Sequence, residues 1–242
     1  MKSIFDHIAT RAREFEQRPL FAYLRDSKID PRERLRFVPF TAHFILTFAD
    51  LSHFFFMESA PKDRYEELIN IQLAEESSHW KWFLTDLTTL GLDPMLRFTD
   101  ALRFVWSDAT AKTRKLSYDI CKLSAGISSL EKLVLVHTME ATGRVAFESA
   151  LPAGRAAGEK LDRKLVFFGP HHLEEELQHT LEEDGVRQEL ESIVLDDATR
   201  ARAVAIVDSV FRSFADFIDE TLECAKSGRG FDRVITEGRA AS

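Results

Sequence analysis

The chain has 242 residues, of which 45% are hydrophobic, and this content is sufficient for one sizeable core in a single large domain. Its net charge of -8 and pI near 5.5 argue against nucleic acid or an anionic membrane as the main partner, because both require clustered positive charge. The two cysteines, Cys121 and Cys224, exclude a disulfide framework and a cysteine-rich metal site, and they favour a reducing compartment.

The N-terminal segment, residues 1–17, carries charges throughout and lacks the apolar stretch of a signal peptide. No later segment is apolar enough to span a bilayer, so we expect a cytoplasmic protein. Without a repeat or a low-complexity linker, residues 1–242 are expected to form one helical domain, with a core from about 20 to 227 and a C-terminal tail at 228–242.

Helical periodicity dominates the chain, and this predicts an all-α fold. Pro31, Pro61, Pro94 and Pro170 are expected near helix starts, and Gly91 suits a C-terminal cap. The expected helices cover residues 3–17, 19–26, 31–58, 62–90, 97–108, 113–150, 155–168, 170–190 and 197–227.

The segment LAEESSHWKWF, residues 73–83, contains Glu76 and His79 at a Glu-x-x-His spacing. On a helix this spacing lets one carboxylate and one imidazole reach a shared metal ion. The flanking tryptophans and phenylalanine are unusual for a solvated face, so we favour ligand roles over a surface salt bridge or a buried structural histidine. Glu75 is the alternative carboxylate.

Glu140 occurs inside an apolar stripe of the expected helix 113–150. The stripe consists of Leu133, Val136, Gly143 and Phe147. An ionised carboxylate facing a core is costly unless it is paired or binds a metal, so Glu140 is a candidate ligand. The alternative is a salt bridge to Arg144, which could also anchor a substrate carboxylate.

The segment PHHLEEELQH, residues 170–179, places three candidate ligands on one helix face. At 100° per residue, His172, Glu176 and His179 lie at relative angles of about 0°, 40° and -20°. Glu174 turns away, and Glu175 is an alternative to Glu176. His171 is offset by one residue and is expected to start the helix or support the site.

These segments give six candidate metal ligands: Glu76, His79, Glu140, His172, Glu176 and His179. Three carboxylates and three imidazoles without a thiolate suit iron or manganese, and bridging carboxylates can hold two ions. Zinc more often uses four ligands, or three plus water.

At these motifs the sequence resembles the heme-oxygenase-like diiron oxidase and oxygenase superfamily, and within it the iron-containing redox enzyme group. The similarity rests on Glu-x-x-His followed by LGLDP, on MEATG around Glu140, and on FFGPHHLEEELQH as His-x-x-x-Glu-x-x-His. Residues 33–51 also resemble that group. Glu176 replaces the aspartate usual in the last motif, and Gln72 stands where relatives often have the early carboxylate.

This resemblance implies a heme-oxygenase-like bundle of about seven helices, related in fold to thiaminase II-like and PQQ-synthesis oxidase-like proteins. It implies two iron ions, or manganese or a mixed pair, no heme, and an oxidoreductase that uses O2 to oxidise a small-molecule substrate. A homodimer is also implied, whereas the substrate and the electron donor are not. Heme oxygenase itself is not favoured, because His7 is a weak match for its proximal histidine.

Two other readings of the residues remain open. A ferritin-like diiron protein would also use two Glu-x-x-His motifs, with Glu58 as its first carboxylate. A metal-free protein of the same fold could bind a small molecule or a protein partner.

Overall fold

A computed structural model describes residues 1–176, 184–227 and 236. Throughout these ranges the secondary structure is helical with no β-strand, which confirms the all-α prediction. The elements are α1 (Lys2–Glu16), α2 (Pro19–Arg25), α3 (Pro31–Arg34), η1 (Val38–Thr41), α4 (Ala42–Leu51), η2 (Ser52–Phe56), α5 (Arg64–Glu76), α6 (His79–Leu90), α7 (Phe98–Val105), η3 (Asp108–Thr110), α8 (Ala111–Ser124), α9 (Ser129–Leu161), α10 (Pro170–Glu176), α11 (Asp184–Glu191) and α12 (Asp197–Lys226).

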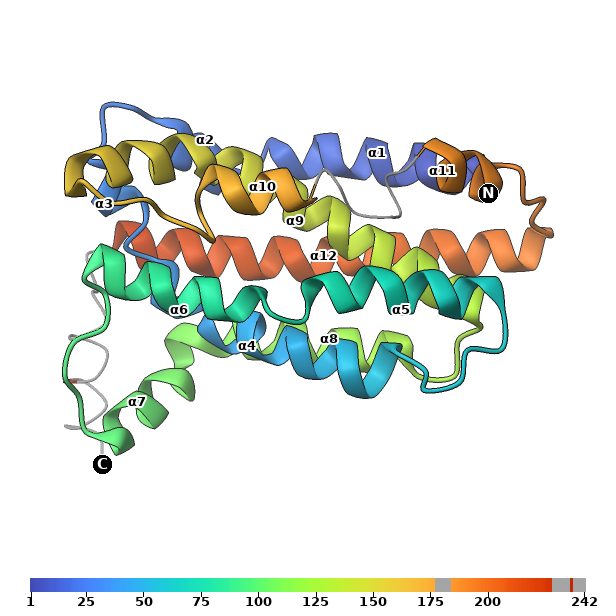
Figure 1. Cartoon of the computed structure of the whole chain (residues 1–242), viewed down its shortest axis with the longest axis horizontal. Helices are drawn as coiled ribbons and strands as arrows, with labels where there is room; N and C mark the ends of the chain where they lie inside the picture. Colours follow the sequence, from blue (N-terminus) through green and yellow to red (C-terminus); the bar gives the residue numbers. More distant parts are fainter. Residues whose placement is uncertain (177–183, 228–235, 237–242) are drawn as a thin grey trace.

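Two long helices, α9 with 33 residues and α12 with 30, pack against each other at the centre of the bundle. Helix α1 contacts both of them along one side, and α8 packs against α12 with α4 beside it on another. Helices α5 and α6 follow one another along the bundle, and α10 lies against α9 (Figure 1). The candidate ligands in the described residues therefore come from α9, which carries Glu140, and from helices around it.

Helix α9 is fixed at its start by a reciprocal cap. The Ser128 hydroxyl accepts the backbone N–H of Glu131, and the Glu131 carboxylate accepts the backbone N–H of Ser128. Arg202 of α12 donates to the same carboxylate and ties the two central helices together. This end of α9 is thus set independently of the candidate site further along.

The helical segments in the described residues, α1 to α12, outnumber both the helices expected from periodicity and the seven or so that the family resemblance implies. The expected helix 31–58 is divided into α3, η1, α4 and η2, and Pro39 in η1 lacks the N–H that a continuous α-helix needs. The expected helix 113–150 is divided into α8, which ends at Ser124, and α9, which begins at Ser129. Gly126 in the connection between them has a positive φ of 72°. In contrast, α9 continues through Pro152, where a break was expected.

The expected turn signals are partly confirmed. Pro31 and Pro170 are the first residues of α3 and α10, and Gly91 caps α6 in the left-handed conformation with a φ of 69°. Pro61 and Pro94 precede α5 and α7 without starting them. Among the described helices, none combines the length and apolar character needed to cross a bilayer.

Candidate metal centre

Glu76 and His79 lie at a junction between two helices. Glu76 is the last residue of α5 and His79 is the first residue of α6. The Ser77 hydroxyl donates to the carbonyl of Ala74 at 2.9 Å, a local bond that competes with helix continuation. The prediction of one uninterrupted helix from 62 to 90 is therefore wrong, yet the break leaves both side chains buried and in contact.

The Glu76 and His79 side chains form a close pair. Oε2 of Glu76 lies 2.9 Å from Nδ1 of His79. The His79 ring stacks on Trp82, with a centroid distance of 4.2 Å and an interplanar angle of 21°. This stacking fixes the plane of the imidazole.

His172 reaches the same place from α10 and is 1% exposed. Its Nδ1 lies 2.9 Å from the carbonyl oxygen of Phe167, so Nδ1–H donates to that carbonyl and Nε2 is the nitrogen that can bind a metal. Metal-binding histidines are commonly oriented in this way. The rings of Phe147 and Phe167 pack on the imidazole at centroid distances of 4.0 and 4.6 Å.

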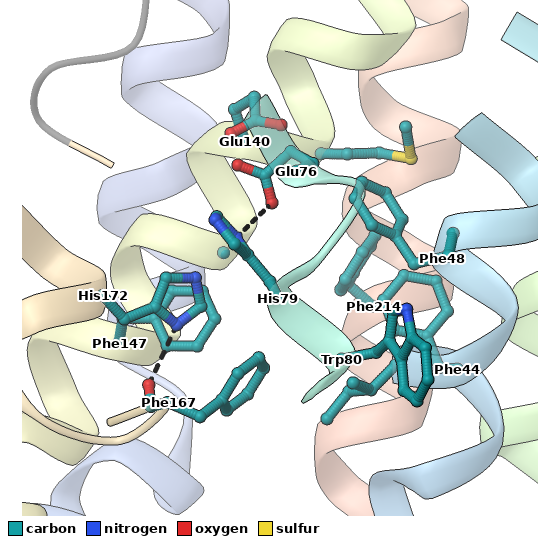
Figure 2. A pocket seen from close by; sticks show the side chains of 14 residues that line it. Phe44, Phe48, Glu76, His79, Trp80, Glu140, Phe147, Phe167, His172 and Phe214 are labelled. Atoms are coloured by element: carbon teal, nitrogen blue, oxygen red, sulfur yellow. Dashed lines mark hydrogen bonds and ion pairs between the residues drawn. The ribbon is translucent and has the colours of Figure 1, made fainter. Parts of the chain in front are cut away.

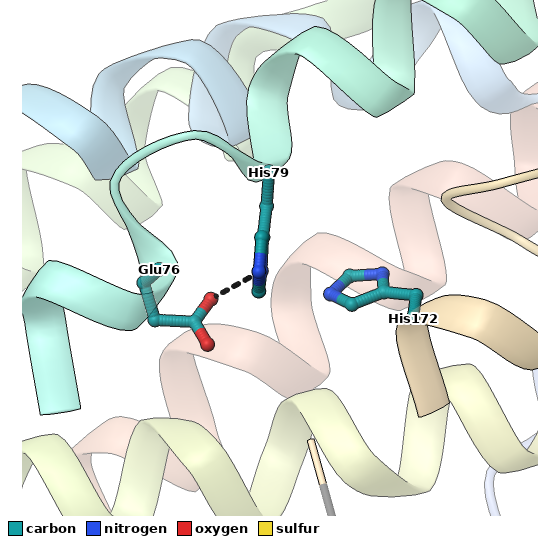
Figure 3. Close-up of side chains that lie close together, drawn as sticks. All are labelled: Glu76, His79 and His172. Atoms are coloured by element: carbon teal, nitrogen blue, oxygen red, sulfur yellow. Dashed lines mark ion pairs between the residues drawn. The ribbon is translucent and has the colours of Figure 1, made fainter. Parts of the chain in front are cut away.

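Glu76, His79 and His172 converge from three helices (Figure 3). Each offers one ligand atom, and these atoms lie within 4.8 Å of one another. With bonds of about 2.1 Å, two ligands at right angles on one ion lie about 3.0 Å apart and two opposite ligands about 4.2 Å apart. The Glu76–His79 spacing already matches the first value, so the donor set fits one metal ion after a small contraction.

Glu140 lines the cavity into which these three side chains project. The cavity has a volume of about 110 Å³ and also receives Met139, Gly143 and Phe147 from α9. In Figure 2 the carboxylates of Glu140 and Glu76 lie at the same end of the cavity. Glu140 therefore lines the same cavity but does not belong to the group of three whose ligand atoms lie within 4.8 Å of one another, so its ligand role stays a prediction.

Two expected ligands cannot be placed to the same extent. Glu176 ends α10, but its side chain lies outside the described part of the structure, and the whole of His179 also lies outside it. The side chain of Glu75 is likewise outside. The ligand roles of Glu176 and His179 therefore stay predictions.

Neither of the expected supporting residues, His171 and Arg144, lines this cavity. His171 is exposed, and its ring packs against Trp82 at a centroid distance of 4.8 Å. Arg144 is half-buried on α9, one turn after Glu140. Trp82 therefore lies between His171 and His79.

Asp86 supports the site and was missed in the sequence. Its side chain is fully buried, and its two carboxylate oxygens accept the backbone N–H groups of Val166 and Phe168 at 2.7 and 2.9 Å. Burial raises the pKa of Asp86, although these backbone hydrogen bonds favour the charged form. The two bonds hold the segment whose Phe167 carbonyl orients His172.

Asp86 could have been found by the reasoning that identified Glu140. It is an acidic residue within an apolar stretch, WFLTDLTTL, and it follows His79 by two helical turns. Its partners could not have been named, because they are backbone groups some 80 residues away.

The same segment packs directly on α9 at Gly154. A Cβ added to Gly154 would lie 1.9 Å from the carbonyl oxygen of Phe168, so a larger residue requires a shift of backbone. The segment that carries Phe167 is thus held by Asp86 from α6 and by close contact with α9.

Comparison with known proteins adds no family assignment. No protein-family model matches the sequence, and no curated protein is significantly similar to it. The function therefore has to be inferred from the residues and their arrangement.

Proposed function

We propose that this protein is a non-heme diiron oxidase or oxygenase that uses O2 to oxidise a small organic substrate. The observation that carries the proposal is the buried convergence of Glu76, His79 and His172 on one cavity. The resemblance of the same motifs to the heme-oxygenase-like diiron superfamily supports both the reaction class and a heme-oxygenase-like arrangement of the bundle. By the same resemblance we propose a homodimer, which sedimentation analysis would test.

The donor set favours iron or manganese. One carboxylate and two imidazoles surround the first metal position, and we propose that Glu140, which lines the same cavity from α9, adds a second carboxylate. Glu176 and His179 are the ligands that we propose for a second ion. Two ferrous ions held by these six residues would supply the electrons for activating O2.

The protein's own contribution is position and exclusion of water. The Phe167 carbonyl sets the tautomer of His172, and Trp82 fixes the plane of His79. Phe44, Phe48 and other hydrophobic residues, most of them aromatic, line the rest of the cavity (Figure 2). Such a wall limits water access and protects reactive species from side reactions.

The placement of other acidic and histidine residues bears on the alternatives. Glu58, the first carboxylate of a ferritin-like reading, lies 3.0 Å from the Lys132 ammonium as an ion pair. His172 supplies a histidine that the ferritin pattern does not need. His7, the candidate heme ligand, pairs with Asp208 at 3.0 Å. We therefore prefer the oxidase.

Anaerobic loading with Fe(II), followed by metal analysis and measurement of O2 uptake, tests the proposal. We expect about two irons per chain and O2 uptake that depends on Fe(II). His172→Ala should lose both, whereas His53→Ala, which removes an exposed imidazole that does not line the cavity, should keep them.

Three outcomes would contradict the oxidase. Iron binding that survives loss of His172 would favour the ferritin-like protein. Wild-type protein that takes up no iron would favour a metal-free binding protein. Iron uptake without O2 consumption would leave a metal site with another function.

A further inference from the structure

A second cavity adjoins the candidate metal site. Its volume is about 120 Å³, and it extends from the metal-site cavity towards α1, α2 and the distal part of α12. The residues common to both cavities are Phe44, Ile45, Gly143, Phe147, Phe167 and Phe214. We call this second cavity the apolar chamber.

The threonines that line the apolar chamber have no hydroxyl proton left to donate to a ligand. Thr41, Thr142 and Thr221 line the chamber, but each hydroxyl donates to a backbone carbonyl within its own helix. A threonine hydroxyl has only one proton to donate, so these three are already used. The other lining residues are glycine and hydrophobic side chains, including fully buried Phe21. A hydrogen-bond acceptor on a ligand would therefore lose its hydration here without compensation.

The size of the chamber limits its occupant. Open apolar space in a core is destabilising, since the lining atoms lose contacts. A cavity of roughly 150 Å³ lined by such residues binds benzene. The apolar chamber is close to this size, so it suits a phenyl ring or a compact branched alkyl group.

Gly143 lies where the two cavities adjoin. It lines both of them on the face of α9 that also carries Glu140 and Phe147. A Cβ at this position would make only ordinary contact with the Phe147 ring, at 3.6 Å. The missing side chain is therefore not required by backbone packing here, and it leaves space where the cavities meet.

We propose that the apolar chamber binds a compact hydrocarbon group of the substrate, of about phenyl size. The attached functional group then extends past Gly143 and Phe147 to the cavity of Glu76, His79 and His172. The role of this group as part of an oxidised substrate rests on the proposed function, whereas its binding to the chamber does not.

Benzene binding to the metal-free protein tests this proposal. Thermal unfolding with and without saturating benzene should show a raised midpoint, because a ligand that binds only the folded state stabilises it. Ala146→Leu fills the chamber from α9 and should weaken benzene binding at least about 10-fold while the variant stays folded. Ala156→Leu, at a similarly half-exposed position of α9 away from the chamber, should bind benzene as the wild type does.

Gly143→Val provides a second test if Ala146→Leu does not fold. It places two methyl groups where the two cavities adjoin and should also reduce benzene binding. An unchanged unfolding midpoint of the wild type in benzene would overturn the proposal, as would an equal benzene effect in wild type and Ala146→Leu. Because the protein is metal-free in this experiment, its failure leaves the iron-loading test intact, and the reverse also holds.

Discussion

His79 and His172 project into the same cavity but are oriented by different kinds of partner. His79 contacts the carboxylate of Glu76, which is itself an expected ligand, whereas His172 donates to the backbone carbonyl of Phe167. A metal ion therefore has to share or replace the first contact but can leave the second unchanged. We infer that the His172 side is preorganised and that the Glu76–His79 side adjusts when metal binds.

The largest loss of Fe(II) affinity is expected at Glu76, which serves both as a proposed metal ligand and as the partner that orients His79. Glu76→Ala removes a carboxylate donor and the contact that orients His79, so Fe(II) affinity should fall by at least about 100-fold. Equilibrium titration with Fe(II) under anaerobic conditions measures this. Glu174→Ala, an exposed carboxylate on α10, is the matched control and should bind as the wild type does. Wild-type affinity in Glu76→Ala would remove Glu76 from the site.

The His172 side can be perturbed through Asp86. In Asp86→Asn one amide N–H₂ has to face a backbone N–H, which should lower the free energy of unfolding by about 1–3 kcal/mol. Displacement of the Phe167 carbonyl should lower Fe(II) affinity about 10-fold. Asp93→Asn changes an exposed carboxylate just after α6 and should leave affinity unchanged. Equal affinities in the two variants would show that the segment does not position His172.

The Glu76–His79 side and the His172 side also differ in how much of each could be predicted from the sequence. Glu76, His79 and His172 were identified from spacing and helix phase, because ligands that share a metal must share a face or a junction. The break at Ser77–Ser78 was not predicted, since the sequence there remains compatible with a continuous helix. The Phe167 carbonyl was unpredictable, because backbone groups carry no sequence signature.

For the overall fold, too, local features could be predicted from the sequence and features that depend on tertiary packing could not. Helical periodicity identified the all-α class and most of α1, α2 and α12, whose bounds agree closely with those expected. Continuation of α9 through Pro152 depends on tertiary packing, including fully buried Ala153 and Ala157, which overrides the local preference of proline. The apolar chamber has walls from many helices, so no single segment could indicate it.

A smaller change, in the free energy of unfolding, is expected at the contact between Gly154 of α9 and the backbone of Phe168. Gly154→Ala places a methyl group against the Phe168 carbonyl and should lower the free energy of unfolding by about 1–3 kcal/mol. Gly143→Ala, in the same helix, meets only ordinary contact and should raise it by about 0.5–1 kcal/mol. Chemical denaturation measures both values. Equal values for the two variants would contradict the close packing of the segment on α9.

The smallest effect on the site is expected at the start of α9. Burial opposes ionisation of Glu131, but hydrogen bonds from Ser128 and Arg202 outweigh it and hold the pKa of Glu131 below its usual value. Its stabilisation is therefore present at neutral pH and is lost as pH falls through the folded-state pKa. Glu131→Gln should cost about 1 kcal/mol at pH 7, less in acid, and should not change Fe(II) affinity. Denaturation curves across pH test the first part, and an altered Fe(II) affinity would contradict the second.

The central claim is that Glu76, His79 and His172 bind the same metal ion. Crystals of the iron-loaded protein, measured at the iron absorption edge, test it most directly. We predict an anomalous peak about 2.1 Å from Oε of Glu76 and from one ring nitrogen each of His79 and His172. A loaded protein whose iron peak lies away from these three side chains would contradict the account.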